Sequence, residues 1–295
     1  MTSAAPTGSI ASRRWSMSRP GRDPRRLTYR VALALCSGLA LGLIVTFAIM
    51  LRTGNVGVKQ VDYVAYYAAA HLVLAGHGSD IYSFAAVGRY ERALVYPLAV
   101  SNGVLPYVYP PYFALALAPA AMLSYVASYL SWLLLNTVLF ILALALLQRY
   151  ASLTRDGALL LWVAAVAFLP LLAALTQGQT SFLILALLAG VFFAARTGRD
   201  WLTGVLLALA LIKPPIVLPF LLLFLVRRRW GVVAGFAATG LCLALVPALL
   251  FGPGIDRGYL DTLSAAMSWR AQFGYGPEWN HSFAGLAQLL LSSPA

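Results

Sequence analysis

Asp62 opens the group of residues with the clearest capacity for chemistry. It lies in residues 61–71, a segment without proline or glycine, and Tyr66 and Tyr67 follow four and five positions later. In a helix, Asp62 and Tyr66 share one face and Tyr67 lies on the neighbouring stripe. A carboxylate there can take a proton from a hydroxyl nucleophile while aromatic rings pack against a sugar ring. The same pattern also suits an interfacial helix with aromatic residues and one solvated aspartate.

Lys213 is the cation whose position in the sequence most strongly suggests a function. It ends the apolar stretch 205–212 and directly precedes Pro214 and Pro215. A charge at the edge of a membrane is costly and usually faces a cavity or a partner. A phosphate leaving group would be such a partner, held by charge-assisted hydrogen bonds. The alternative is a lysine that extends along the apolar surface to the aqueous interface.

Three further polar groups interrupt the apolar sequence. Tyr109 precedes two prolines, Gln179 lies in a Gln-Gly-Gln-Thr turn, and Asn280 and His281 lie at the start of the last apolar run. Each also has a plain structural interpretation as a loop, a turn, or a helix cap by Asn280 or Ser282. No two of the three histidines have metal-ligand spacing, so no metal ligand is predicted. Dependence on a divalent metal stays open.

The elements that must position these residues are membrane helices. Hydrophobic residues make up 61% of the 295 residues, charged residues only 10%, and the mean hydropathy is +0.81. A soluble domain carries about a quarter charged residues, so polar groups are too few here to cover a water-soluble globule. We expect an all-α fold, a polytopic bundle of membrane helices. The apolar runs are 31–51, 112–123, 126–147, 158–175, 181–195, 202–212, 216–226 and 232–251.

The distribution of positive charge predicts the topology and gives no sign of a nucleic-acid partner. Seven arginines lie within residues 1–30 and seven more lie at positions 149, 155, 196, 199 and 227–229, which makes 14 of the 21 basic residues. If residues 112–123 do not cross the membrane, all 14 lie on one side with the N-terminus. If they cross, the division is 10 against 11. The positive-inside rule prefers the first arrangement, with seven spans and residues 112–123 re-entrant or interfacial.

This arrangement defines the domain organisation. Residues 1–30 are expected to be a disordered basic cytoplasmic tail, and residues 31–295 one multispanning membrane domain. Residues 31–51 are too long for a cleaved signal peptide, so they are a retained span. The long loop 52–125, which carries interfacial helices, the turn 177–180 and the stretch from residue 252 lie outside. Residues 202–212 and 216–226 form a short hairpin with Lys213 at its outer apex. The apolar run 283–291 stops at the end of the sequence, so we expect a partial chain.

The order of these motifs resembles glycosyltransferase family 87, from about residue 31 to the end. The motifs are Asp62-Tyr63, Tyr66-Tyr67, Tyr109-Pro110-Pro111, Gly178-Gln179, Lys213-Pro214 and Asn280-His281-Ser282. Members are multispanning GT-C-type enzymes, described mostly as polyprenyl-phosphate-mannose-dependent alpha-mannosyltransferases. The resemblance implies a GT-C-like fold, a catalytic aspartate at Asp62, and a lipid-linked sugar donor whose phosphate lies near Lys213. Members usually continue for several further spans.

We therefore expect a multi-pass glycosyltransferase of the cell membrane, acting in the cell envelope, with a cytoplasmic N-terminus and its active site on the outer face. It would move a sugar, expected to be mannose, from a polyprenyl-phosphate donor to a hydroxyl of a lipid or glycan acceptor, with inversion and without a further cofactor. Asp62 is the predicted catalytic residue. The predicted substrate-binding residues are Tyr66, Tyr67, Tyr109, Gln179, Lys213, Asn280 and His281.

The main alternative is a transporter or flippase for a lipid-linked or anionic substrate that uses the same outer cavity. The broken hairpin at Lys213 favours it. The sequence shows neither an internal repeat nor an acidic residue in the middle of a span, and both count against it. A non-catalytic membrane scaffold is a third possibility, which loss of Asp62 without functional consequence would favour.

Overall fold

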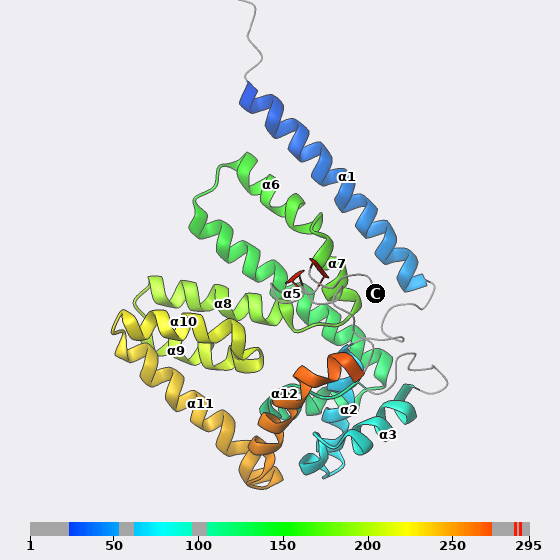
Figure 1. Ribbon diagram of the computed structural model, residues 1–295. Helices are drawn as coiled ribbons and strands as arrows, with labels where there is room; N and C mark the ends of the chain where they lie inside the picture. The colour runs from blue at the N-terminus through cyan, green and yellow to red at the C-terminus, as the bar shows by residue number, and fades with distance from the viewer. Residues whose placement is uncertain (1–23, 53–61, 96–104, 273–285, 288, 291–295) are drawn as a thin grey trace, which may run out of the picture.

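The computed structural model describes residues 24–52, 62–95, 105–272, 286–287 and 289–290 (Figure 1). Their regular structure is helical, with no strand among them, which confirms the predicted all-α class. In chain order the elements are α1 (Pro24–Arg52), α2 (Asp62–Leu74), η1 (Gly78–Asp80), α3 (Phe84–Val95), α4 (Pro111–Leu117), η2 (Ala118–Met122), α5 (Tyr125–Ala151), α6 (Arg155–Val166), α7 (Leu169–Thr176), α8 (Ser181–Arg196), α9 (Asp200–Leu209), η3 (Ala210–Ile212), α10 (Pro214–Val226), α11 (Trp230–Phe251) and α12 (Ile255–Gln272). Helix α1 includes residues 24–30, which were expected in the disordered tail; proline suits a first helical position, where its missing N–H has no partner.

Three of the described helices, α1, α5 and α11, are long and apolar enough to cross a membrane. The bent pair α6 and α7 brings the number to four if it is one span. Leucines on the three helices are largely exposed, with Leu39 at 61%, Leu134 at 68% and Leu249 at 82%. Apolar surface on this scale needs a lipid environment, so this is a membrane protein. The arrangement of seven spans stays a prediction, because α8, α9 with η3, and α10 are apolar but shorter.

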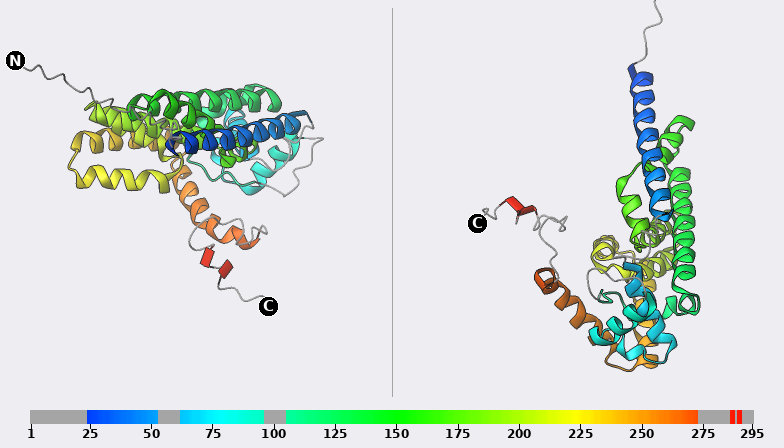
Figure 2. Two further views of the ribbon diagram at one scale, coloured as in Figure 1. Left: turned by 90° about the horizontal axis from the view of Figure 1, so that it is seen from above. Right: turned by 90° about the vertical axis from the view of Figure 1, so that its right-hand side faces the viewer.

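The apolar run 158–175, expected to be continuous, is broken between α6 and α7 by a bend of 49°. Phe168 adopts an extended conformation there, and Pro170 stands in the first turn of α7. A continuous helix would need an N–H from Pro170 to the carbonyl of Val166, which proline cannot supply. Helix α1 runs along the outside of the molecule beside α6 (Figure 2).

The predicted hairpin before and after Lys213 is present as α9, η3 and α10. Helix α9 lies directly against α11, so a Cβ atom added at Gly204 would overlap the carbonyl oxygen of Val232. A Cβ added at Gly235 would lie 2.5 Å from the carbonyl oxygen of Trp201. Such glycine contacts let two membrane helices approach at backbone distance.

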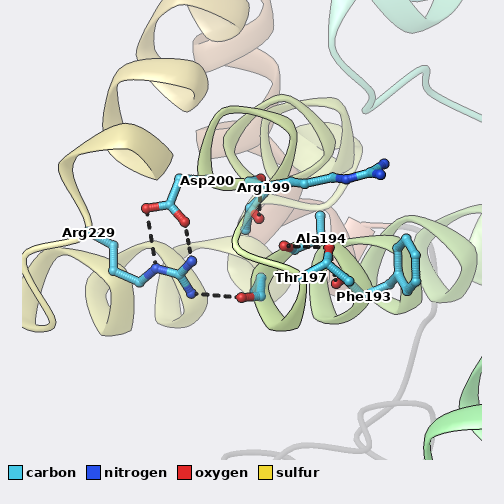
Figure 3. Close-up of polar contacts among 8 residues, drawn as sticks. Phe193, Ala194, Thr197, Arg199, Asp200 and Arg229 are labelled. Atoms are coloured by element: carbon cyan, nitrogen blue, oxygen red, sulfur yellow. Dashed lines mark hydrogen bonds and ion pairs between the residues drawn. The ribbon is translucent and has the colours of Figure 1, made fainter.

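Polar contacts hold α9 and α11 together at the end that lies away from Lys213 (Figure 3). Arg229, just before α11, forms an ion pair with Asp200 at the start of α9. The same guanidinium donates to the carbonyl oxygen of Ala195 in α8, at 3.2 Å. The ends of three helices are therefore tied together, and the hairpin that carries Lys213 is fixed against α11.

Helix α2 lies at the centre of a cap formed with α3, α4 and η2 (Figure 1). The sequence suggested a helix along the membrane interface, but α2 is buried on all its faces from Tyr63 to Ala70. The reason is its composition: between Asp62 and His71 it contains only tyrosine, alanine and valine and offers no polar face to water. The segment 112–123 forms two short elements, α4 and η2, neither long enough to span a bilayer.

Candidate active site

The first turn of α2 is fixed by contacts to α5 and to the turn between α7 and α8. The peptide N–H of Tyr63 donates to the carbonyl oxygen of Gln177 at 3.4 Å. The Tyr63 hydroxyl and the Ser128 hydroxyl of α5 are 2.6 Å apart, and the Tyr63 ring stacks on Trp132 with centroids 5.9 Å apart. Asp62, directly before Tyr63, is therefore held against this turn.

Gly178 makes this close approach possible. It has a φ of +64°, and a Cβ atom added to it would lie 2.9 Å from Cβ of Tyr63. Its carbonyl oxygen accepts a hydrogen bond of 2.7 Å from the indole N–H of Trp132. Only glycine combines the positive φ with the missing side chain at this contact. As a result the next residue, Gln179, reaches the start of α2.

Asp62 lies within electrostatic range of Gln179 and Lys213 at this point. Burial raises the pKa of the Asp62 carboxyl, while the charge of Lys213 and a hydrogen-bonding interaction with the Gln179 side chain act in the opposite direction. Burial lowers the pKa of Lys213, which lies between η3 and α10, and the charge of Asp62 raises it. All three side chains stay partly accessible. The arrangement combines a carboxylate base with a cation, as acyl, phosphoryl or glycosyl transfer to a hydroxyl requires.

Tyr66 and Tyr109 form the aromatic side of the same site. The Tyr66 hydroxyl donates to the Tyr109 hydroxyl at 2.7 Å, and the two rings meet edge to face with centroids 4.7 Å apart. Tyr109 thus keeps its own O–H proton for a second partner. Burial, with the nearby charge of Asp62, raises the pKa of Tyr109 to about 12, so its hydroxyl stays protonated and able to donate at neutral pH.

The loop that carries Tyr109 is anchored by residues that the sequence analysis did not single out. The Tyr82 hydroxyl donates to the carbonyl oxygen of Tyr109 at 2.7 Å. The peptide N–H of Leu105 donates to one carboxylate oxygen of Glu91 at 3.0 Å. Glu91 is fully buried, and its other oxygen has no partner among the described residues. Burial raises the pKa of Glu91 to about 7.

The eight predicted site residues fall into three groups. Asp62, Tyr66, Tyr109, Gln179 and Lys213 come together in one place, as the interactions above show. The Tyr67 hydroxyl instead donates to the carbonyl oxygen of Leu123 in the cap. Asn280 and His281 lie outside the described residues.

An apolar groove of about 610 Å³ begins beside this cluster. It is lined by residues of α5, α6, α7 and α8 and follows the break between α6 and α7. Gln179 and Ser181 are its polar members, and the Ser181 hydroxyl donates to the side-chain oxygen of Gln179 at 3.2 Å. Gln179 is therefore shared by the groove and the site of Asp62. In the part of the chain that the structure describes, no three His, Cys, Asp or Glu side chains are grouped like metal ligands.

No solved structure matches this chain, but a known glycosyltransferase and a protein-family model do. The Alpha-(1->3)-arabinofuranosyltransferase of Corynebacterium glutamicum is 29% identical over 171 residues, which cover 54% of this chain and 40% of that relative. The chain thus spans less than half of that relative's length.

The sequence model described as Glycosyltransferase family 87 matches residues 107–294, more than half of the chain. The matched region contains Tyr109, Gln179 and Lys213, and it begins after α2, so Asp62 lies before it. With the order of motifs and the helical membrane fold, this match confirms the resemblance found in the sequence: the chain belongs to glycosyltransferase family 87.

Proposed function

We propose that this chain is a membrane glycosyltransferase that transfers a sugar from a lipid-linked phosphate donor to an acceptor hydroxyl, with Asp62 as general base. The observation that carries the proposal is that Asp62, Gln179 and Lys213, which come from three distant segments, interact electrostatically. The family supports the reaction class. The proposed site lies on the outer face of the cell membrane, as the distribution of arginines favours.

The reaction is a single displacement at the anomeric carbon. Asp62 takes the proton of the acceptor hydroxyl, and the acceptor oxygen forms the new bond to the anomeric carbon. The bond from that carbon to the phosphate oxygen breaks, and the phosphate leaves with the electron pair. Lys213 offsets its charge. Attack from the face opposite the leaving group inverts the configuration of the anomeric carbon.

The two charged groups suit this reaction. None of the ion pairs among the described residues joins Asp62 to Lys213, so both remain available to a substrate. A sugar ring between them would face the carboxylate on one side and carry its phosphate toward the ammonium on the other. Lys213 has a second effect, because its charge favours the ionised, proton-accepting form of Asp62.

The apolar groove supports a donor whose carrier is a lipid. It opens from the same Gln179 that interacts with Asp62, and its walls are side chains of apolar helices. A hydrocarbon chain can move from the bilayer to such walls at little cost, because both surroundings are apolar. A phosphate at the polar end would lie toward Lys213, with its chain in the groove. A polyprenyl phosphate has this shape.

The identity of the transferred sugar is a separate and more specific part of the proposal. The resemblance to family 87 implies mannose, whereas the relative from C. glutamicum is named for arabinofuranose. The first experiment therefore supplies membranes carrying the chain with polyprenyl-phosphate mannose and polyprenyl-phosphate arabinose, each labelled in the sugar. Appearance of label in a new lipid or glycan measures transfer.

Asp62→Asn is the decisive variant in this assay, and Asp261→Asn is its control, because Asp261 is an exposed carboxylate of α12. Transfer should fall roughly 10²–10⁴-fold in Asp62→Asn and stay unchanged in Asp261→Asn. Near-wild-type transfer by Asp62→Asn contradicts the proposed base. Movement of intact labelled donor across the membrane, without a new glycosidic bond, supports the transporter reading, which the hairpin around Lys213 favours.

A further inference from the structure

A second pocket lies at the other end of α2, between α2, η1 and α3. It has a volume of about 490 Å³, and its polar lining is His77, Asp80, Arg89 and Tyr90, while Leu72 contributes to its apolar floor. The proposed transfer reaction uses none of these residues. Small-molecule sites usually have volumes of this order, a mainly apolar lining and a few converging polar groups.

The lining distinguishes between classes of ligand. Asp80 only accepts hydrogen bonds when ionised, Arg89 only donates, and the His77 ring can do either. Asp80 would repel a phosphate, and Arg89 would repel a metal ion or an amine. A hydroxyl group both donates and accepts, so a ring that carries several hydroxyls can satisfy Asp80 and Arg89 together. Its C–H faces can pack against the Tyr90 ring and Leu72.

The position of the pocket relates it to the candidate active site. Asp62 is the first residue of α2, and Leu72 lies ten positions later on the same helix. At a rise of 1.5 Å per residue, the two positions are about 15 Å apart along the helix axis. Helix α2 is buried along its length between them, so this separation is fixed.

We propose that the pocket is a saccharide subsite, which holds a sugar residue of a glycan acceptor some distance from the end that reacts at Asp62. This rests on the proposed function and makes the acceptor an oligosaccharide or a lipid with an oligosaccharide head. An acceptor of one sugar at Asp62 is too short to reach the pocket, whereas a chain of several sugars is long enough to span about 15 Å. The pocket therefore selects acceptors by length.

Binding tests the subsite without any turnover. The purified protein in lipid nanodiscs is mixed, without donor, with mannose and arabinose oligosaccharides of one to four residues, and saturation-transfer NMR measures their affinity. Arg89→Ala and Asp80→Asn each remove a charged hydrogen-bonding partner and should weaken binding of the longer oligosaccharides roughly tenfold. Arg92→Ala is the control, because it removes the same charge from an exposed position of α3 outside the pocket.

Kinetics then test the role in acceptor selection. In Arg89→Ala and Asp80→Asn the KM for a tetrasaccharide acceptor should rise roughly tenfold, while kcat and the KM for a monosaccharide acceptor stay the same. Unchanged oligosaccharide affinity in both variants, or displacement of the oligosaccharide by inorganic phosphate, overturns the subsite. Equal changes in KM for short and long acceptors overturn its role in selection. If oligosaccharides bind in a way that depends on Arg89 but the protein has no transferase activity, the subsite is supported and the proposed function is wrong.

Discussion

The peptide N–H of Tyr63 donates to the carbonyl oxygen of Gln177, so the start of α2 is tied directly to the turn between α7 and α8. These two residues are more than a hundred positions apart in the sequence. This contact joins the cap, which supplies Asp62, to the turn between α7 and α8, which supplies Gln179. The geometry of the proposed base is therefore set by the backbone of the turn.

Replacing Gly178 tests this contact. In Gly178→Ala the new Cβ would meet Cβ of Tyr63 at 2.9 Å, at a residue with a φ of +64°. We expect the turn to move away from α2 and separate Gln179 from Asp62. Unfolding should become easier by about 1–3 kcal/mol, and transfer should fall by more than this loss of stability explains. Thermal unfolding in nanodiscs and the transfer assay measure the two effects.

Gly198→Ala is the matched control. Gly198 has a φ of +71°, but a Cβ atom there would meet nothing within 4 Å. Gly198→Ala should lose about 1–2 kcal/mol of stability, which is the cost of an alanine in the left-handed backbone conformation. Its transfer activity should be unchanged. If both variants lose activity equally, the contact between Gly178 and Tyr63 has no special role in the site.

Several parts of this arrangement could be predicted because their signals are local. Asp62 and Tyr66 share a helix face by spacing alone, and Lys213 stands out because two prolines end the helix beside it. The break after Val166 has Pro170 as its signal, but that signal is not decisive. Pro219 lies inside α10 and Pro247 inside α11, so a proline in an apolar run does not by itself break a helix here.

Burial in the cap could not be predicted, because it depends on packing between distant segments. Helix α3 has Arg89 and Arg92 beside Glu91, a pattern typical of a solvated helix face. Glu91 is nonetheless buried, and the peptide N–H of Leu105, 14 positions later, binds its carboxylate. Helix α2 likewise becomes central only when α3, α4 and η2 cover it.

Lys213 has two predicted effects that separate it from a simple interface anchor. In Lys213→Ala, kcat/KM for the donor should fall roughly 10²-fold, because the leaving phosphate loses its cation. The pKa of Asp62 should also rise, since the charge of Lys213 lowers it. The rate depends on ionised Asp62, so the acidic limb of the pH–rate profile should move to higher pH.

Arg257→Ala serves as the control for Lys213, because Arg257 is an exposed cation of α12 with 87% of its side chain accessible. It should change neither donor kinetics nor the pH profile. Unchanged donor kinetics in Lys213→Ala would reduce Lys213 to an anchor at the interface.

The groove can be tested by filling it. Ala165 of α6 lines the groove, so Ala165→Phe places a ring where we propose the lipid chain of the donor. The KM for a donor with a long polyprenyl chain should rise roughly tenfold, whereas a donor with a single short prenyl chain should be less affected. Ala127→Phe adds the same ring at an exposed position of α5 outside the groove. An identical response of both donors to Ala165→Phe contradicts the proposed binding mode.

Glu91 predicts a dependence of stability on pH. Its pKa in the folded protein, about 7, lies above its ordinary value of 4.5, so folding favours the protonated carboxyl. The stabilisation is fully present below pH 4.5 and is lost as the pH rises through about 7. Glu91→Gln keeps a neutral side chain whose oxygen can accept the Leu105 N–H. The variant should therefore lose less stability than the wild type as the pH rises through this window.

The measurement is the midpoint of thermal unfolding between pH 5 and 8.5, with Asp261→Asn as a control that should follow the wild type. Glu91→Ala should be less stable than Glu91→Gln by about 1–3 kcal/mol, because it leaves the N–H of Leu105 without a partner. Since Leu105 leads into the loop that carries Tyr109, Glu91→Ala should also raise the KM for substrates, and Glu91→Gln should restore it. Parallel pH dependence in the wild type and Glu91→Gln would mean that Glu91 does not titrate in this range.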